Sequence, residues 1–291
     1  MSGTPTNRTN IALPSEVSNE IIQKTQEGSV IMQLARKVNL PGRGIEIPII
    51  TADPAPAWVG ETEAKPVSNP TLNKKTMRGY KLAVIVPFSN EFKRDMASLY
   101  DVLVSRLPAV LGEKFDNTVF GGTQAPGDSF DSLGDVTAHS LASDVYQGLL
   151  DADTQIALNG GINTDYVISP QAKGILLGEK DDNGRPLFIN SVAEGAIPMI
   201  LGVPTKTTKA AYITGSPKTV GFAGQWDKAW YGIVDGLTID ISTEATLDLG
   251  GGSVINLFQQ NMFAVRAEIE VGFVADKDVF AKLTASTVPS F

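Results

Sequence analysis

The chain of 291 residues contains a single histidine, so any search for catalytic chemistry begins with His139. A Ser-His-Asp triad would have to use this residue, because the histidine takes the proton from the serine nucleophile. No Gly-x-Ser-x-Gly turn is present to expose such a serine. The absence of cysteine excludes disulfides, thiol catalysis and cysteine-based metal sites. We therefore interpret His139 as structural and expect neither catalysis nor a metal.

Two loops approach known ligand-binding motifs without completing them. Residues 179–190 have the acidic and amide residues of a calcium loop, but position twelve is Asn190 where a bidentate glutamate is required. The Asn183-Gly184 pair within this stretch is typical of a tight turn instead. The glycines at 250–252 are not followed by the lysine and hydroxyl residue of a phosphate loop. The sequence thus predicts no cofactor and no enzymatic activity.

Charge is divided unevenly along the chain. The net charge is −8, with +2 in residues 1–120 and −10 in residues 121–291. The acidic second half would repel phosphates, so we expect no sequence-specific binding of nucleic acid. The basic cluster NKKTMR at 73–78 fits a rim that meets an acidic protein surface better than a nucleic-acid groove. No apolar run reaches the ~18 residues of a membrane span, and no secretory signal pattern is visible.

The first hundred residues predict an arm, a helix and a long excursion. Residues 1–12 are polar, and Pro14-Ser15 begins a helix that resumes after Gly28. Residues 45–51 and 80–88 alternate in polarity as strands do. Between them lie almost thirty residues of proline-rich and polar sequence that expose Trp58. We expect the two strands to form a very long hairpin, a length that compact domains rarely carry without a function.

The longest predicted helix follows Ser89 or Asn90, either of which can cap it. Its apolar residues recur every three or four positions as far as Val119, Pro108 should kink or divide it, and Gly121-Gly122 ends it. Further helices are predicted at 141–152 and 170–179, and strands at 165–170, 221–246 and 255–274. Trp226 and Trp230 are expected on one strand face, in the core. Because helices and strands mix without a regular βαβ order, the predicted class is α+β.

The order of these pieces resembles the major capsid proteins of tailed bacteriophages. The resemblance rests on IPIITADPAPAWVGETEAKP, the helix ending in VFGG, DYVISPQAKGILLGEKDDNGRPLF and NMFAVRAEIEVGF. It extends from about residue 13 to the end of the chain, and order and spacing carry it rather than any single motif. The resemblance implies the Hong Kong 97-like capsid fold, an α+β fold.

That fold would divide the chain into named parts. The resemblance implies an N-terminal arm at 1–14, an N-terminal helical segment of the P-domain at 15–40, an extended E-loop at 41–90, the P-domain spine helix at 91–120, an A-domain at 121–235, P-domain strands at 236–271 and a C-terminal segment returning to the A-domain at 272–291. The E-loop would lie across an adjacent subunit, which would supply the partner surface for Trp58. The pattern begins almost at Met1, so scaffolding would come from another protein or be dispensable.

Interpreting residues 41–90 as an E-loop also predicts interface residues and a candidate covalent bond. The expected interface residues are Trp58, Glu61, Lys65, Lys74, Lys75 and Arg78. Some relatives join subunits by an isopeptide bond from an E-loop lysine to a P-domain asparagine, assisted by a glutamate; the resemblance puts Lys65, Asn261 and Glu268 at these positions. Seven residues apart on one presumed strand, Asn261 and Glu268 would face opposite sides unless a bulge intervenes. The favoured interpretation is that all three are ordinary polar residues.

The resemblance implies a structural role. Copies would assemble into hexamers and pentamers of an icosahedral shell enclosing double-stranded DNA, within a virion assembled in the host cytoplasm. Partners would be copies in the same and adjacent capsomers, with scaffold, portal and decoration proteins, and no membrane. An encapsulin-type nanocompartment, which packages an enzyme in place of DNA, is the alternative. A soluble enzyme is disfavoured because no convergent catalytic residues are present.

Overall fold

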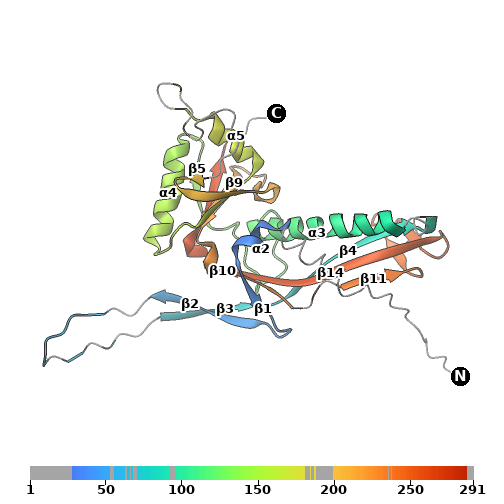
Figure 1. The fold of residues 1–291 in the computed structure, drawn as a ribbon, viewed down its shortest axis with the longest axis horizontal. Helices are drawn as coiled ribbons and strands as arrows, with labels where there is room; N and C mark the ends of the chain where they lie inside the picture. The colour runs from blue at the N-terminus through green and yellow to red at the C-terminus, as the bar shows by residue number, and fades with distance from the viewer. Residues whose placement is uncertain are drawn as a thin grey trace.

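The computed structural model describes residues 28–52, 56–62, 64, 65, 67, 71–91, 96–180, 184, 187, 199–234, 236 and 238–286. Figure 1 shows three parts: a long helix lying along an extended sheet, a mixed domain at one end of that layer, and a hairpin that projects away from both. This mixture of helix and sheet agrees with the predicted α+β class. The helical residues expected between Pro14 and Glu27 lie outside the described part of the chain.

The longest strand, β14 (Met262–Ala275), organises the elongated sheet. One edge pairs antiparallel with β4 (Tyr80–Ser89) over the whole length of β4. The other edge pairs with β11 (Thr238–Ser242) and then with β10 (Ala229–Ile233). A parallel strand, β1 (Arg36–Asn39), adds to β10. One strand therefore connects the far end of the elongated part to the mixed domain.

Helix α3 (Met96–Phe120) covers this sheet and contributes to two cores. Its middle residues Leu107 and Leu111 pack on Phe263 and neighbouring apolar residues of β14. Its last turns carry Phe115 and Phe120 into a second core, which includes the short helix α2 (Val30–Leu34). At ~1.5 Å per residue, a helix of this length spans the whole elongated part.

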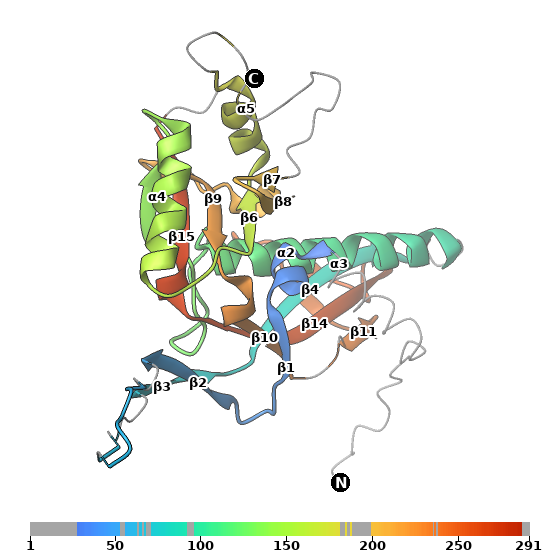
Figure 2. The ribbon, with the colours of Figure 1, turned by 60° about the vertical axis from the view of Figure 1, so that its left-hand side comes forward.

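The mixed domain is built on a six-stranded sheet (Figure 2). Its order is β5 (Thr137–Ser140), β15 (Phe280–Ala285), β9 (Lys218–Gly224), β6 (Asp165–Ile168), β8 (Val203–Thr207) and β7 (Met199–Ile200). Helices α4 (Val145–Leu158) and α5 (Pro170–Gly178) pack on it through a separate apolar core. The described elements in and next to this domain include the 3₁₀ turns η2 (Lys209–Ala211), η3 (Trp226–Lys228) and η4 (Lys277–Val279). Strand β15 comes from the end of the chain, so the sheet depends on a contact between distant segments.

Local sequence explains where these helices begin and end. The Asp144 carboxylate accepts from the Gln147 amide at 2.9 Å and caps α4, and Ser169 caps α5 directly before Pro170. Helix α3 ends at Gly121, whose φ of 88° is in the left-handed region. A Cβ at this position would lie 2.6 Å from the Gly134 Cα, so only glycine fits.

The expected pairing of residues 45–51 with 80–88 is wrong. Strand β2 (Ile45–Ala52) pairs instead with β3 (Thr71–Met77), which arises from sequence that we expected to be loop. Strand β4 follows β3 directly but turns away to pair with β14. The polar and lysine-rich composition of β3 concealed it, because a two-stranded arm has little core to bury and shows little apolar alternation.

Two smaller expectations also need correction. Helix α3 continues through Pro108 and is not divided there. Trp226 lies on the 3₁₀ turn η3 and is buried in the core that contains Phe115 and Phe120 of α3. Trp230 lies on β10 and packs against a separate cluster that contains Leu40 and Met77. The two tryptophans therefore do not share a strand face, because the 3₁₀ turn between them breaks the period of two.

Candidate assembly surface

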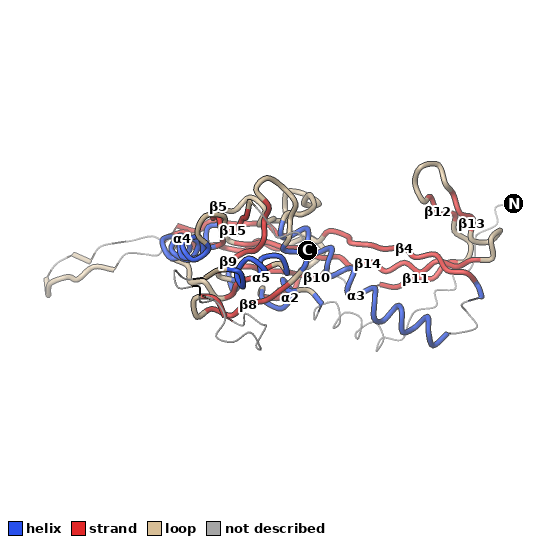
Figure 3. The backbone as a smooth tube through the Cα atoms, turned by 90° about the horizontal axis from the view of Figure 1, so that it is seen from above, coloured by secondary structure: helices blue, strands red, loops and turns tan. Residues whose placement is uncertain are grey.

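The projecting hairpin is the most unusual surface of the subunit. Strands β2 and β3 pair from Ile45–Met77 at the base to Ala52–Thr71 near the tip, and the described loop residues beyond them are exposed (Figures 1 and 3). The Trp58 side chain has 105% relative exposure, and Val67 has 90%. A monomer gains nothing from exposing an indole and a valine at the end of an arm, so this tip has the character of an interface.

Lys75 on β3 attaches the base of the hairpin to the body. Its ammonium donates to the Asp131 carboxylate at 2.8 Å and to the Ala275 carbonyl at 2.7 Å. Asp131 also accepts from the Ala275 amide at 3.1 Å. Both charged side chains are largely covered, with 30% and 18% exposure. Because this pair is partly desolvated and doubly hydrogen-bonded, it fixes the base of the arm to the end of β14.

Asp116 makes a second buried attachment, between α3 and α2. Its carboxylate accepts from the Ser29 hydroxyl at 2.5 Å, the Val30 amide at 2.9 Å and the Ile31 amide at 3.4 Å. Burial raises the pKa of Asp116 from its ordinary value of 3.8 to about 6, although these hydrogen bonds pull it down and nearby Glu113 adds to the rise. The polar start of α2 is thereby satisfied inside the core.

The structure separates the predicted interface residues into two groups. Trp58, Glu61 and Lys65 are all exposed in the described tip loop. The other three lie on or next to β3 near the hairpin base, and they are Lys74, Lys75 and Arg78. The Lys74 ammonium lies 3.1 Å from Glu46 across the ladder, and Arg78 is exposed. Lys75 is bonded within its own subunit, so the tip group offers the freer surface.

The three cross-link candidates lie apart in one subunit. Lys65 is at the hairpin tip, whereas Asn261 precedes β14 at the opposite end of the molecule (Figures 1 and 3). Asn261 has a φ of 52°, and its amide oxygen accepts from the Asn90 side chain at 2.7 Å. Glu268 lies about 23 Å further along the strand at the usual rise per strand residue. A reaction among these groups would therefore require more than one copy.

Glu268 is also poorly prepared to act as a base. Its carboxylate accepts from the Lys81 ammonium at 2.8 Å, and this hydrogen bond lowers the pKa of Glu268. A carboxylate held ionised by a lysine takes a proton less readily than a buried one. The observed surroundings therefore agree with the interpretation that Glu268 is an ordinary polar strand residue.

Sequence reasoning missed two further exposed apolar surfaces. The hairpin of β12 (Thr246–Asp248) and β13 (Val254–Asn256) exposes Leu249 and Val254 beside a tip of three glycines with positive φ, and Phe258, just after β13, is also exposed. Helix α4 exposes Tyr146, Leu150 and Leu158 on the side away from its sheet. The four- and eight-residue spacing along α4 could have indicated a second apolar stripe.

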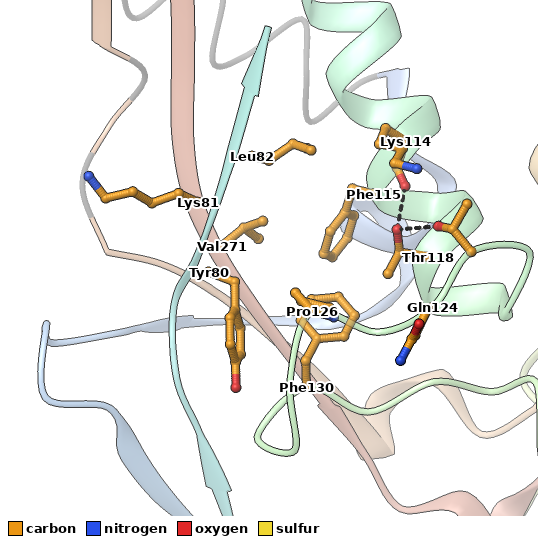
Figure 4. Close-up of a pocket in the computed structure, with 11 residues that line it drawn as sticks. Tyr80, Lys81, Leu82, Lys114, Phe115, Thr118, Gln124, Pro126, Phe130 and Val271 are labelled. Carbon is orange, nitrogen blue, oxygen red and sulfur yellow. Dashed lines mark hydrogen bonds between the residues drawn. The ribbon is translucent and has the colours of Figure 1, made fainter. Parts of the chain in front are cut away.

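A cavity of about 150 Å³ opens between α3 and β4 (Figure 4). Its wall is mostly apolar and includes Tyr80, Phe115 and Phe130. The Phe130 ring meets Tyr80 at a centroid distance of 6.2 Å and Phe115 at 6.1 Å, both edge to face. Thr118 satisfies its hydroxyl inside the subunit, donating to the Lys114 carbonyl at 2.9 Å. The cavity therefore suits an apolar or aromatic group.

No arrangement for catalysis or metal binding emerges in the described part of the chain. His139 lies on β5, and its Nε2 is 3.0 Å from the Gln155 side-chain oxygen. Among the described residues there is no group of three metal-ligating side chains, and no helix is long and apolar enough to cross a membrane. Gly184 has a φ of 77°, as the predicted turn requires, whereas Asn183 and Asn190 lie outside the described residues.

Comparison with known proteins decides among these readings. Residues 9–284 match the model of the phage capsid family. The chain belongs to the phage capsid family. It is 30% identical over 289 residues to the probable major capsid protein gp17 of Mycobacterium phage L5, covering 94% of this chain and 89% of that protein. Membership places the chain among the structural proteins of the virion.

Solved structures show the same fold. A chain of Gordonia phage Cozz superposes with a TM-score of 0.73 at 19% identity, covering 89% of this chain and 87% of that one. The capsid of a native GTA particle, computed with C5 symmetry, gives 0.65 at 15% identity over 98% and 96% of the two chains. The resemblance to phage major capsid proteins is thus confirmed, and the nanocompartment alternative is not favoured.

Proposed function

We propose that this capsid protein self-assembles into hexamers and pentamers of an icosahedral shell that encloses double-stranded phage DNA. The projecting β2–β3 hairpin is the observation that carries the proposal, because the described residues of its tip, Trp58 and Val67 among them, are exposed. In a closed symmetric shell each copy repeats the same contacts, so many modest interfaces together hold the particle. The structure of the similar GTA capsid was computed with C5 symmetry, which fits a shell that contains pentamers.

The subdomains follow from this proposal in the Hong Kong 97-like arrangement. Residues 41–90 form the E-loop, of which the β2–β3 hairpin is the projecting part while β4 joins the elongated sheet. The spine helix of the P-domain includes α3, and the six-stranded sheet with α4 and α5 forms most of the A-domain. Residues 236–271 supply P-domain strands, and 272–291 return to the A-domain through β15. The N-terminal arm is residues 1–14, followed by the helical segment to residue 40.

Other partners follow from the same role. The shell would close around DNA without reading its sequence, since the acidic second half of the chain repels phosphate. Scaffold, portal and decoration proteins would meet the assembling capsomers in the host cytoplasm. The exposed apolar residues of the β12–β13 hairpin and of α4 are further surfaces for contacts between copies.

Electron microscopy and sedimentation of the purified protein test the assembly. We expect round shells or ring-shaped capsomers far larger than the 30.9-kDa chain. A single sedimenting species of monomer mass at high concentration, with no particles on the grid, would overturn the proposal. Nuclease-protected DNA in particles from infected cells would support the phage shell, whereas a packaged enzyme would favour the nanocompartment.

A further inference from the structure

The hairpin tip and the aromatic cavity are complementary features that lie far apart in one subunit. Trp58 is fully exposed at the end of the arm, whereas the cavity lies in the body between α3 and β4. The ladder from Ile45–Met77 to Ala52–Thr71 extends the arm by about 23 Å at the usual rise per strand residue. The arm points away from the body in all views (Figures 1, 2 and 3). In this arrangement Trp58 lies far from the cavity of its own subunit, so we look to a second copy for the contact.

The cavity has a size and an apolar lining that suit an aromatic ring. A volume near 150 Å³ is enough to hold a benzene ring in a protein interior. The rings of Tyr80, Phe115 and Phe130 already meet edge to face, and a further ring entering among them would extend that packing. Gln124 lines the opening with an exposed side chain, whose carbonyl can accept from the indole N–H.

The cavity opening and the hairpin tip carry charges of opposite sign. Lys114 is exposed and lines the α3 side of the cavity, and Glu61 follows Trp58 by three residues in the tip loop. Lys81 also lines the cavity, but its ammonium points away and is held by Glu268 at 2.8 Å (Figure 4). Lys114 is therefore the cation that a docked tip would meet, and opposite charges at the rim orient such a contact.

We propose that the Trp58 indole of one copy inserts into the cavity lined by Tyr80, Phe115 and Phe130 of a second copy, with Glu61 facing Lys114. This inference rests on the proposed assembly role and names the contact that the hairpin makes. A tryptophan that fills a pocket at the centre of a contact is a frequent hot spot, whereas surrounding residues contribute little.

The absence of native cysteine allows a direct test by disulfide formation. Ala57→Cys and Gln124→Cys are combined in one chain, and particles are assembled, oxidised and run on a non-reducing denaturing gel. We expect a ladder of linked chains from particles and single chains from dilute, unassembled subunits. The control pairs Ala57→Cys with Thr154→Cys, an exposed position on α4, and should stay unlinked. Assembled particles in which the two introduced thiols form no link between chains would overturn the docking but leave the assembly role intact.

Substitutions supply an independent measure of the same contact. Trp58→Ala should raise the protein concentration needed for half-assembly about tenfold or more, whereas Val67→Ala, an exposed apolar control on the same loop, should change it less than about threefold. Glu61→Lys and Lys114→Glu should each impair assembly, and the double variant should recover it. Equal effects of Trp58→Ala and Val67→Ala, or no recovery in the double variant, would refute the docking. A wild-type chain that forms no particles would refute both proposals.

Discussion

The buried Asp116 predicts an unusual dependence of subunit stability on pH. Its pKa is about 6 in the folded subunit and close to its ordinary 3.8 once the chain unfolds. The folded state therefore binds the proton more tightly, so protonation of Asp116 stabilises the fold. This contribution is fully present below pH 3.8 and is lost as the pH rises through about 6. Its sign is opposite to that of a salt-bridged carboxylate.

The size of the effect follows from the two pKa values. A difference of roughly 2 units corresponds to about 3 kcal/mol at the limit of low pH. Relative to pH 7, the linkage relation gives about 1.3 kcal/mol at pH 5 and about 2.4 kcal/mol at pH 4. Asp116→Asn removes the titrating group and should abolish this gain, while also costing a constant amount because its NH₂ cannot accept from the α2 amides.

Urea unfolding of unassembled subunits at several pH values measures the pH-dependent stabilisation by Asp116. The quantity of interest is the free energy of unfolding of the wild type minus that of Asp116→Asn, which should grow as the pH falls from 7 to 4. Asp128→Asn, at an exposed loop position, provides the matched control and should leave the pH dependence unchanged. A difference that stays constant between pH 7 and 4, or shrinks, would refute the assignment of a raised pKa to Asp116.

Three further predictions concern the hairpin. Lys75→Met should lower the free energy of unfolding by about 1–2 kcal/mol, because the largely buried Asp131 carboxylate then keeps only the Ala275 amide and the more distant Lys277 ammonium at 3.9 Å. Lys74→Met, on the exposed side, should cost less than about 0.5 kcal/mol; urea unfolding checks both, and equal costs would contradict the attachment of the hairpin base through Lys75. Replacing residues 56–67 by a short glycine-rich turn should leave stability unchanged but prevent shell formation; normal particles by microscopy would exclude the tip from assembly. Mature particles boiled in detergent should run as one band near 30.9 kDa, because the Asn261 amide is already bonded; a ladder that disappears in Lys65→Arg would show cross-linking instead.

The sequence predicted those elements whose own residues carry a strong period. The burial of strand β4 alternates over its first six residues, and helices were expected at 141–152 and 170–179, where α4 and α5 overlap them. Strand β3 could not be found in this way, since its partner is another polar strand on an arm with almost no core. Helix α3 similarly contains Pro108 because packing along its length outweighs one unfavourable residue.

The same contrast explains what could be predicted about the assembly surface. Trp58 was identifiable because an indole amid prolines and polar residues has no local partner, and that signal is a property of the sequence alone. The attachment of Lys75 to Asp131 joins residues that are 56 positions apart, so only the folded chain reveals it. The base of the hairpin is therefore bonded to the body through Lys75, whereas its tip exposes Trp58. Rigidity at the base lowers the entropy lost when the tip docks, which is how modest contacts can direct a shell to close.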